Sequence, residues 1–252
     1  MIYIIKKQKT IMIVILTILV LITVLCGDIE IRGALVRKEI KNFTSRGEYV
    51  ETIDDIDYYA VHKQYDYENT EDRIFSIGDL FVGTTGDIYI NSTNPLENTG
   101  VVGDWLCNRL KMGHAAMAYS ADASLSCEST AFYNAGVRII GSDWIAHNHY
   151  MDEMFALRVK NITADQRQTI KDWVDEKEGT KFNYFYLLRL KNRLYCSDFV
   201  ARAYEEIGVD IDGHQLFSYQ STMICDDDTY LIFYCLKPFN ETSNFKVYYL
   251  CD

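Results

Sequence analysis

The sequence predicts an α+β fold in which an antiparallel β-sheet or barrel packs against helices, preceded by an N-terminal membrane segment. Three patterns predict it: an apolar run from Ile11 to Cys26, several short β-rich segments separated by turn-forming residues, and two later stretches with helical periodicity. The composition agrees, because 48% of the 252 residues are hydrophobic and only 2 are prolines. Such a chain folds around one substantial core.

Residues 1–27 are predicted to be a signal-anchor or a signal peptide. Lysines between positions 6 and 9 precede the apolar run, as in a positive n-region followed by a hydrophobic segment. The bulky Leu25 before Cys26 makes a poor lipoprotein cleavage site, which favours an uncleaved anchor. Because lysines beside a membrane segment stay in the cytoplasm, we expect an extracytoplasmic domain that is membrane-anchored or secreted. A buried core helix is the alternative interpretation.

Residues 28–75 are predicted to be a spacer, and residues 76–252 to be the folded domain. The spacer is rich in charge and tyrosine, with one short helix expected around Leu35–Ile40. The domain begins with a β-rich run at residues 77–82, which Gly83 ends. Turn residues separate the other predicted strands and favour an antiparallel arrangement. These strands are His114–Tyr119, Ala123–Glu128, Gly136–Ile140, Met154–Val159, Tyr230–Cys235 and Phe245–Leu250.

Two helices are predicted in the second half of the chain. The first follows Thr163, which has capping-box spacing to Gln166, and it continues until Gly179. Its apolar face consists of Ile170, Trp173 and Val174. The second helix begins near Cys196 and ends at Gly208, with an apolar face formed by Phe199, Val200, Ala203, Tyr204 and Ile207.

The net charge and the cysteine spacing argue against two classes of protein, nucleic-acid-binding proteins and small disulfide-rich scaffolds. The formal net charge of -11, without a compact basic stripe, excludes nucleic acid as an expected partner. The 7 cysteines show no Cys-x-x-Cys pair and no spacing typical of a disulfide framework, so the pairing is not predicted. No cofactor and no bound metal are expected.

Cys196 is the candidate nucleophile, because it lies where a helix should begin. The free N–H groups and the positive end of the helix dipole would then face the sulfur and favour thiolate over thiol. The alternative is a core cysteine, since free cysteine is among the most buried residue types.

His114 is the candidate base among the 5 histidines. It begins a strand of small residues, Gly113 to Ala118, where backbones can approach closely and the imidazole stands at the strand edge. Glu128 on the next predicted strand could accept from one ring nitrogen and leave the other for the thiol. Two other roles are possible here: a solvated glutamate, or zinc held by Cys107, His114 and Cys127. The remaining histidines lie in the spacer or in predicted loops.

The order of these parts is that of a circularly permuted papain-like fold. A histidine strand, an acidic strand and a connecting helix precede the cysteine helix, and over about residues 77–212 the chain resembles the YaeF/YiiX-type permuted papain-like amidases of the NlpC superfamily. The residues that carry the resemblance are Gly78–Val82, Gly113–Met117, Glu128, Gly136–Val137, Gly179–Tyr184, Tyr195–Val200, Ala203–Tyr204 and Gly208–Asp212. After Asp212 the chain departs from the pattern, because relatives often carry a proline there.

The resemblance implies an extracytoplasmic cysteine amidase or peptidase. Cys196 would be the nucleophile, His114 the base and Glu128 the residue that orients it, with an acyl-enzyme intermediate. Tyr195 and Tyr184 are interpreted as substrate-binding pocket walls, or alternatively as packed tyrosines. The expected substrate is a peptidoglycan stem peptide or an N-acylated, lipid-like amide. A non-catalytic module that binds cell-wall or lipid fragments in the same groove is the alternative function.

Overall fold

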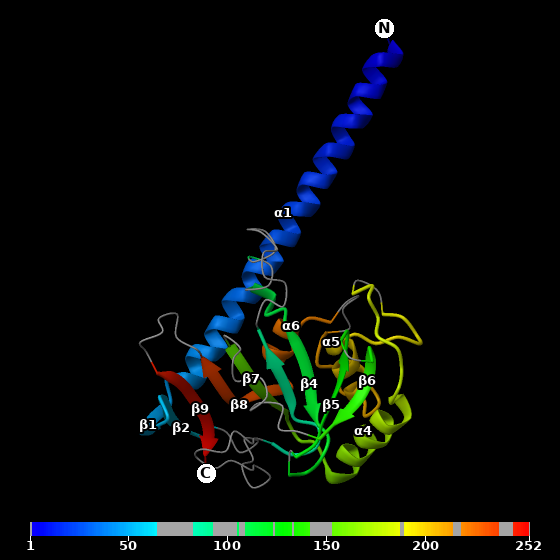
Figure 1. The fold of residues 1–252 in the computed structure, drawn as a ribbon. Coiled ribbons are helices and arrows are strands. Elements are labelled where there is room, and N and C mark those ends of the chain that lie inside the picture. The colour runs from blue at the N-terminus through cyan, green and yellow to red at the C-terminus, as the bar shows by residue number, and fades with distance from the viewer. Residues whose placement is uncertain are drawn as a thin grey trace.

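The computed structural model describes residues 2–64, 83–92, 105, 109–122, 124–132, 134–141, 153–186, 189–213, 218–236 and 244–251. It consists of one long N-terminal helix and a sheet with shorter helices packed on it (Figure 1). The strand predicted at residues 77–82 lies outside the described residues, as do Cys107, His147, His149 and His214.

Helix α1 (Ile2–Thr44) projects from the domain (Figure 1). It holds one apolar stretch long enough to cross a membrane, with a mean hydropathy of 2.4, and no part of that stretch is buried. A core helix would be buried, so the core-helix alternative is wrong. The domain-side end is different: Val36 and Phe43 are buried in the core.

The region predicted as a spacer contributes to the sheet. Strands β1 (Gly47–Ile53) and β2 (Ile56–His62) form a hairpin, and β2 pairs in parallel with the C-terminal strand β9 (Phe245–Cys251). Tyr59 stacks on Tyr248 of β9, with ring centroids 4.6 Å apart. The prediction of a spacer is therefore corrected for residues 47–62, where the tyrosines serve as sheet contacts rather than as linker residues.

The described strands form one nine-stranded sheet in the order β1-β2-β9-β8-β7-β3-β4-β5-β6. Its remaining members are β3 (Ile88–Asn91), β4 (His114–Ala118), β5 (Ser126–Thr130), β6 (Gly136–Ile140), β7 (Glu153–Val159) and β8 (Thr229–Leu236). The sheet is open, with β1 and β6 at its edges, so the barrel that was the alternative to a sheet is not formed. All neighbours are antiparallel except β2 and β9.

Both predicted helices are present. Helix α4 (Ala164–Lys177) has the capping box: the Thr163 hydroxyl accepts from the Gln166 N–H, and the Gln166 side chain accepts from the Thr163 N–H. Helix α5 (Cys196–Glu205) follows, and Trp173 of α4 packs on Phe199 of α5 with ring centroids 5.6 Å apart. Helix α5 lies against β4 and β5, which brings its first residue to the sheet.

Two short elements were not predicted from the sequence. Strand β3 has 4 residues and helix α6 (Gln220–Ile224) has 5, too few to show a periodic pattern. Both are important to the site, because Asn91 ends β3 beside His114 and Gln220 begins α6 beside Cys196.

Candidate active site

Cys196 is the first residue of α5, as predicted. Tyr195 is the N-cap in an extended conformation, and its side chain does not cap the helix. The N–H groups of Ser197 and of Ala115 on β4 point toward the sulfur of Cys196. Cys196 is 8% exposed, so the residue is buried and does not lie at the open surface.

Sheet register brings the predicted base and its partner onto one face. Ala116 lies directly opposite Glu128 on β5, and Glu128 lies directly opposite Arg138 on β6. Because alternate residues of a strand share a face, His114 lies diagonally across from Glu128 on the same side of the sheet. The three side chains therefore form a row across three adjacent strands.

Glu128 is held by charged groups on both sides. His114 Nε2 lies 2.6 Å from Glu128 Oε2, and Arg138 donates to Glu128 Oε1 from Nε at 2.8 Å and from Nη2 at 2.5 Å. The Glu128 side chain is only 5% exposed. Burial works against its charge, but the hydrogen bonds and charges of His114 and Arg138 outweigh it and lower the pKa of Glu128 to about 2. The carboxylate is thus ionised at neutral pH.

His114 and Cys196 are hydrogen-bonded to each other. Since Nε2 faces Glu128, the other ring nitrogen, Nδ1, is the one available to the sulfur. Burial disfavours the imidazolium, but contacts with Cys196 and Glu128 outweigh that effect and raise the pKa of His114 to about 10. Burial also disfavours the thiolate, yet His114 and the two N–H groups lower the pKa of Cys196 below its ordinary value. Both shifts favour the thiolate–imidazolium form of the pair.

The backbone before His114 lies tightly against β3. The Asn91 side-chain carbonyl accepts from the His114 N–H at 2.9 Å. A Cβ placed on Gly113 would lie 2.1 Å from the main-chain oxygen of Asn91, so only glycine fits this approach. The run of small residues around His114 thus sets the position of the imidazole, as the sequence predicts.

Gln220 is a site residue that sequence reasoning missed. Its side-chain amide nitrogen lies 3.9 Å from Cys196 Sγ, and the residue is 4% exposed. Helix α6 places it there, and the preceding Ser218 fastens this segment to α5. The Ser218 N–H donates to the Tyr195 hydroxyl at 2.8 Å, and its carbonyl accepts from the Ser197 hydroxyl at 2.8 Å. A glutamine 24 positions after the cysteine carries no recognisable spacing signal, so only the fold reveals it.

The two tyrosines predicted as pocket walls differ. Tyr195 is 2% exposed and its hydroxyl accepts from Ser218, which supports the packing interpretation. Tyr184 is 56% exposed and packs edge-on against Phe182, 5.1 Å between ring centroids. Tyr186 was not predicted as a pocket wall, yet it lies beside Tyr195, with the two ring centroids 6.0 Å apart. Burial and the charge of Cys196 raise the pKa of the Tyr186 hydroxyl.

Buried charges anchor the start of α5 to the preceding loop. Asp198 is fully buried and accepts from Arg189 Nε at 2.8 Å and from Arg202 Nε at 2.9 Å. Arg189 also pairs with Glu205 at 2.7 Å. The segment before Cys196 is therefore tied to both ends of the helix that Cys196 begins.

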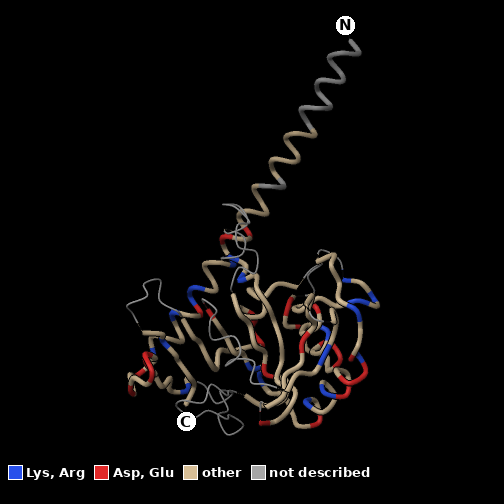
Figure 2. The backbone as a smooth tube through the Cα atoms, viewed as in Figure 1, with Lys and Arg blue, Asp and Glu red and all other residues tan. Residues whose placement is uncertain are grey.

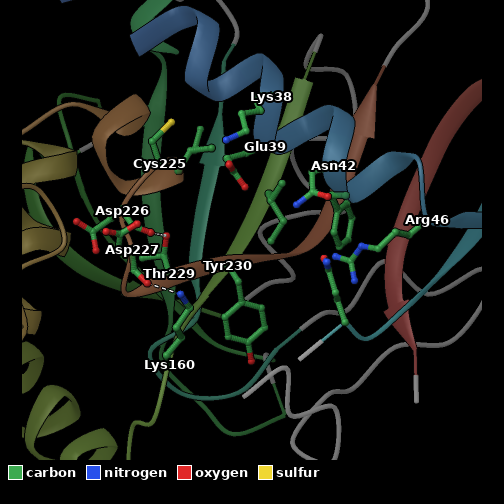
Figure 3. A pocket seen from close by; sticks show the side chains of 14 residues that line it. Lys38, Glu39, Asn42, Arg46, Lys160, Cys225, Asp226, Asp227, Thr229 and Tyr230 are labelled. Carbon is green, nitrogen blue, oxygen red and sulfur yellow. Dashed lines mark hydrogen bonds between the residues drawn. The ribbon is translucent and has the colours of Figure 1, made fainter. Parts of the chain in front are cut away.

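Within the described residues, no group of three or more His, Cys, Asp or Glu side chains is arranged to hold a metal ion. Two of the three ligands of the alternative zinc site can be stated. Cys107 lies outside the described residues, and the Cys127 thiol donates a hydrogen bond to the Met117 carbonyl. A polar cavity of about 300 Å³ lies elsewhere, between α1 and the segment from α6 to β8 (Figure 3). Lys38, Glu39 and Asp226 line it, and it shares no residue with the cysteine site.

Comparison with known proteins agrees with this geometry. The family model described as permuted papain-like amidase enzyme, YaeF/YiiX, C92 family, matches residues 82–245. The chain belongs to this family. Permuted papain-like amidases are hydrolases, which is the class of activity assigned here at the level of the family. The match includes His114, Glu128 and Cys196, and it extends beyond Asp212, where the sequence resemblance ended.

A structure search finds a solved structure with a weak similarity to part of this chain. The crystal structure of metalloprotein yiiX from Escherichia coli O157:H7 is 14% identical, with a TM-score of 0.44, over 59% of this chain and 96% of that one. No curated protein matches the chain significantly.

Proposed function

We propose that the chain is an extracytoplasmic cysteine hydrolase that cleaves an amide bond, peptide or N-acyl, through a Cys-His-Glu acyl-enzyme mechanism. One observation carries the proposal: His114 contacts Glu128 at 2.6 Å through one ring nitrogen and Cys196 through the other. A nucleophile, a base and an orienting carboxylate in contact are what acyl transfer by a thiol needs.

The proposed reaction has two halves. Cys196 thiolate attacks the amide carbonyl carbon and forms a C–S bond, while the carbonyl oxygen becomes an oxyanion. The side-chain amide of Gln220, beside the sulfur, and the N–H groups at the start of α5 would donate to this oxyanion. The His114 imidazolium gives its proton to the leaving amine as the C–N bond breaks. Water, deprotonated by His114, then releases the acid and regenerates the thiolate.

Two classes of amide are proposed as the substrate. A peptidoglycan stem peptide and an N-acylated, lipid-like amide both suit a site that lies outside the membrane. Support for that location comes from α1, whose apolar stretch follows a lysine-rich flank. A non-catalytic binding module would have no need for the charged His114–Glu128 pair beside a thiol, so the site geometry favours an enzyme.

The test is turnover by the full chain in detergent micelles, with peptidoglycan fragments and N-acyl amides as substrates. We expect release of a free amine from one of the two classes, and complete loss of release in Cys196→Ala. Cys235→Ala is the matched control, because Cys235 is equally buried but lies on β8, away from the site. Turnover that survives in Cys196→Ala, or that fails equally in Cys235→Ala, would contradict the proposal.

A further inference from the structure

Exposed aromatic side chains gather beside the active site. Tyr184, Phe185 and Tyr186 are 56%, 70% and 50% exposed, and Phe132, two residues beyond the end of β5, is 66% exposed. We call these four residues the aromatic patch. Among the described residues outside α1, the other exposed large apolar side chains are Tyr49, Val50 and Leu236. A cluster of this kind marks a contact surface, whereas single exposed apolar residues are ordinary.

The aromatic patch packs on one buried side chain and is joined by one hydrogen bond. Phe182 is 3% exposed, and its ring packs edge-on against both Tyr184 and Tyr186, at 5.1 and 5.8 Å between centroids. The Tyr184 hydroxyl donates to the carbonyl of Ala131, which precedes Phe132, at 3.5 Å. These contacts join the two segments of the patch into one surface.

The segment that carries Tyr184, Phe185 and Tyr186 is basic, although the protein as a whole is acidic. From Gly179 to Ser197 the sequence contains no Asp or Glu, although the chain has a formal net charge of -11. Lys181, Lys191 and Arg193 are exposed there. Figure 2 shows blue positions along this part of the tube, between α4 and α5. Aromatic side chains flanked by Lys and Arg match the chemistry of an anionic membrane surface.

Helix α1 keeps the domain close to any bilayer it spans. Its apolar run ends at Cys26, and contacts with the domain begin at Glu30, which accepts from Trp105 Nε1 at 2.7 Å and from Arg109 Nε at 3.0 Å. Four helical residues span only about 6 Å, which is about the depth of one headgroup layer. The end of the domain from which α1 projects therefore lies against the headgroups.

The aromatic patch lies at that end of the domain. In Figure 1 the yellow segment between α4 and α5 rises to the end from which α1 projects. We propose that the aromatic patch contacts the same bilayer that α1 spans, with Lys191 and Arg193 facing anionic headgroups. The patch is thus a second membrane contact, in addition to the anchor.

This contact would turn the site toward the membrane surface. Tyr186 belongs to the patch and its ring lies 6.0 Å from that of Tyr195, the residue before Cys196. A domain docked through the patch therefore presents the thiol to lipid headgroups. If the proposed hydrolase function holds, this orientation favours amides that reside in the membrane over soluble peptides.

The test uses the full chain reconstituted in vesicles of phosphatidylcholine and phosphatidylglycerol. Phe185→Trp adds a fluorophore to the patch, and lipids brominated in the acyl chain quench it if it enters the interface. We expect the added fluorescence to fall by about half, because interfacial side chains lie about 5–10 Å into the headgroup boundary. The control is Tyr49→Trp on β1, where the native residue is 59% exposed against 70% for Phe185, and it should not be quenched. The signal of the native tryptophans is subtracted.

A second arm tests the charge. Lys191→Glu combined with Arg193→Glu, or vesicles of phosphatidylcholine alone, should reduce quenching at position 185 and leave position 49 unchanged. Equal quenching at both positions, absence of quenching at position 185, or a chain that does not float with the vesicles would overturn the proposal. All measurements are made in the Cys196→Ala background, so a failure of membrane contact is distinguished from a failure of catalysis.

Discussion

At the scale of single residues, the site depends on two charges that burial alone would remove. Burial opposes both the Cys196 thiolate and the His114 imidazolium. Cys196 and Glu128 sustain the imidazolium, whereas His114 and the N–H groups of Ala115 and Ser197 sustain the thiolate. Arg138 in turn keeps Glu128 ionised. The four side chains therefore act as one charged network, and a change in any of them should move the titration of the others.

Glu128→Gln should narrow the pH range of activity. The thiolate–imidazolium pair exists above the pKa of Cys196 and below that of His114, which is about 10. Loss of the Glu128 charge lowers the pKa of His114, so the alkaline limb of the kcat/KM profile should move to lower pH. A profile that coincides with that of the native enzyme would refute the role of Glu128.

Gln220→Ala should affect the chemical step and not the thiolate. Removing one oxyanion donor lowers kcat by about 10²–10³-fold. KM and the rate at which iodoacetamide alkylates Cys196 should change little, because alkylation forms no oxyanion. If alkylation slows as much as turnover does, Gln220 acts on the thiol and the oxyanion role is wrong.

At the scale of secondary-structure elements, the sequence predicts most of what carries the site. The start of α5 at Cys196, the strand that begins at His114 and the capping box before α4 are all confirmed. These features are local, since periodicity and caps involve residues a few positions apart. Strand β3 and helix α6 escape prediction because they are short, and with them Asn91 and Gln220.

Gly113→Ala should displace the base. The added Cβ would lie 2.1 Å from the Asn91 main-chain oxygen, so β4 must move away from β3 and carry His114 with it. We expect slower alkylation of Cys196 at neutral pH, measured by mass spectrometry of the labelled peptide. The matched control is Gly141→Ala, where the nearest atom, Leu125 Cδ2, is 3.7 Å away. Equal rates in the two variants would show that the β3–β4 approach does not position His114.

Thr163→Ala should lower stability without changing the chemistry. The capping box is lost, which costs about 1 kcal/mol in the free energy of unfolding. Urea denaturation measures that loss, and Thr163→Ser should restore most of it. The rate of Cys196 alkylation should be unchanged, because α4 supports α5 through Trp173 and Phe199 at some distance from the thiol. A slower alkylation rate would show that α4 positions the site directly.

At the scale of the whole molecule, long-range pairing is what the sequence could not predict. Strand β2 pairs with β9, and His62 lies opposite Cys251, 189 residues later. A local sequence pattern does not indicate such a pairing, so the sequence alone predicts a spacer at residues 47–62. An open sheet and a barrel have the same alternating strands, and only the complete strand order distinguishes them.

The order of the elements that carry the proposed site is the global feature that the sequence does predict. A His114 strand before the Cys196 helix indicates a permuted papain-like chain, and the family match bears this out. The contacts of α1 with the domain begin only four residues beyond its apolar run, so the apolar stretch and the domain are joined without a free linker. We expect the position of the site relative to a bilayer to be part of its specificity.

The most direct test of the central claim is the pH dependence of Cys196 alkylation in the full chain. Iodoacetamide reacts with thiolate, and mass spectrometry separates Cys196 from Cys251, whose sulfur lies 3.5 Å from the Val61 carbonyl and 3.8 Å from the exposed His62 ring. We predict that Cys196 reaches its maximal rate well below the ordinary thiol pKa of about 8.5, and that His114→Ala shifts its curve to higher pH. A Cys196 curve that follows an ordinary thiol and is unchanged by His114→Ala would contradict the thiolate–imidazolium pair.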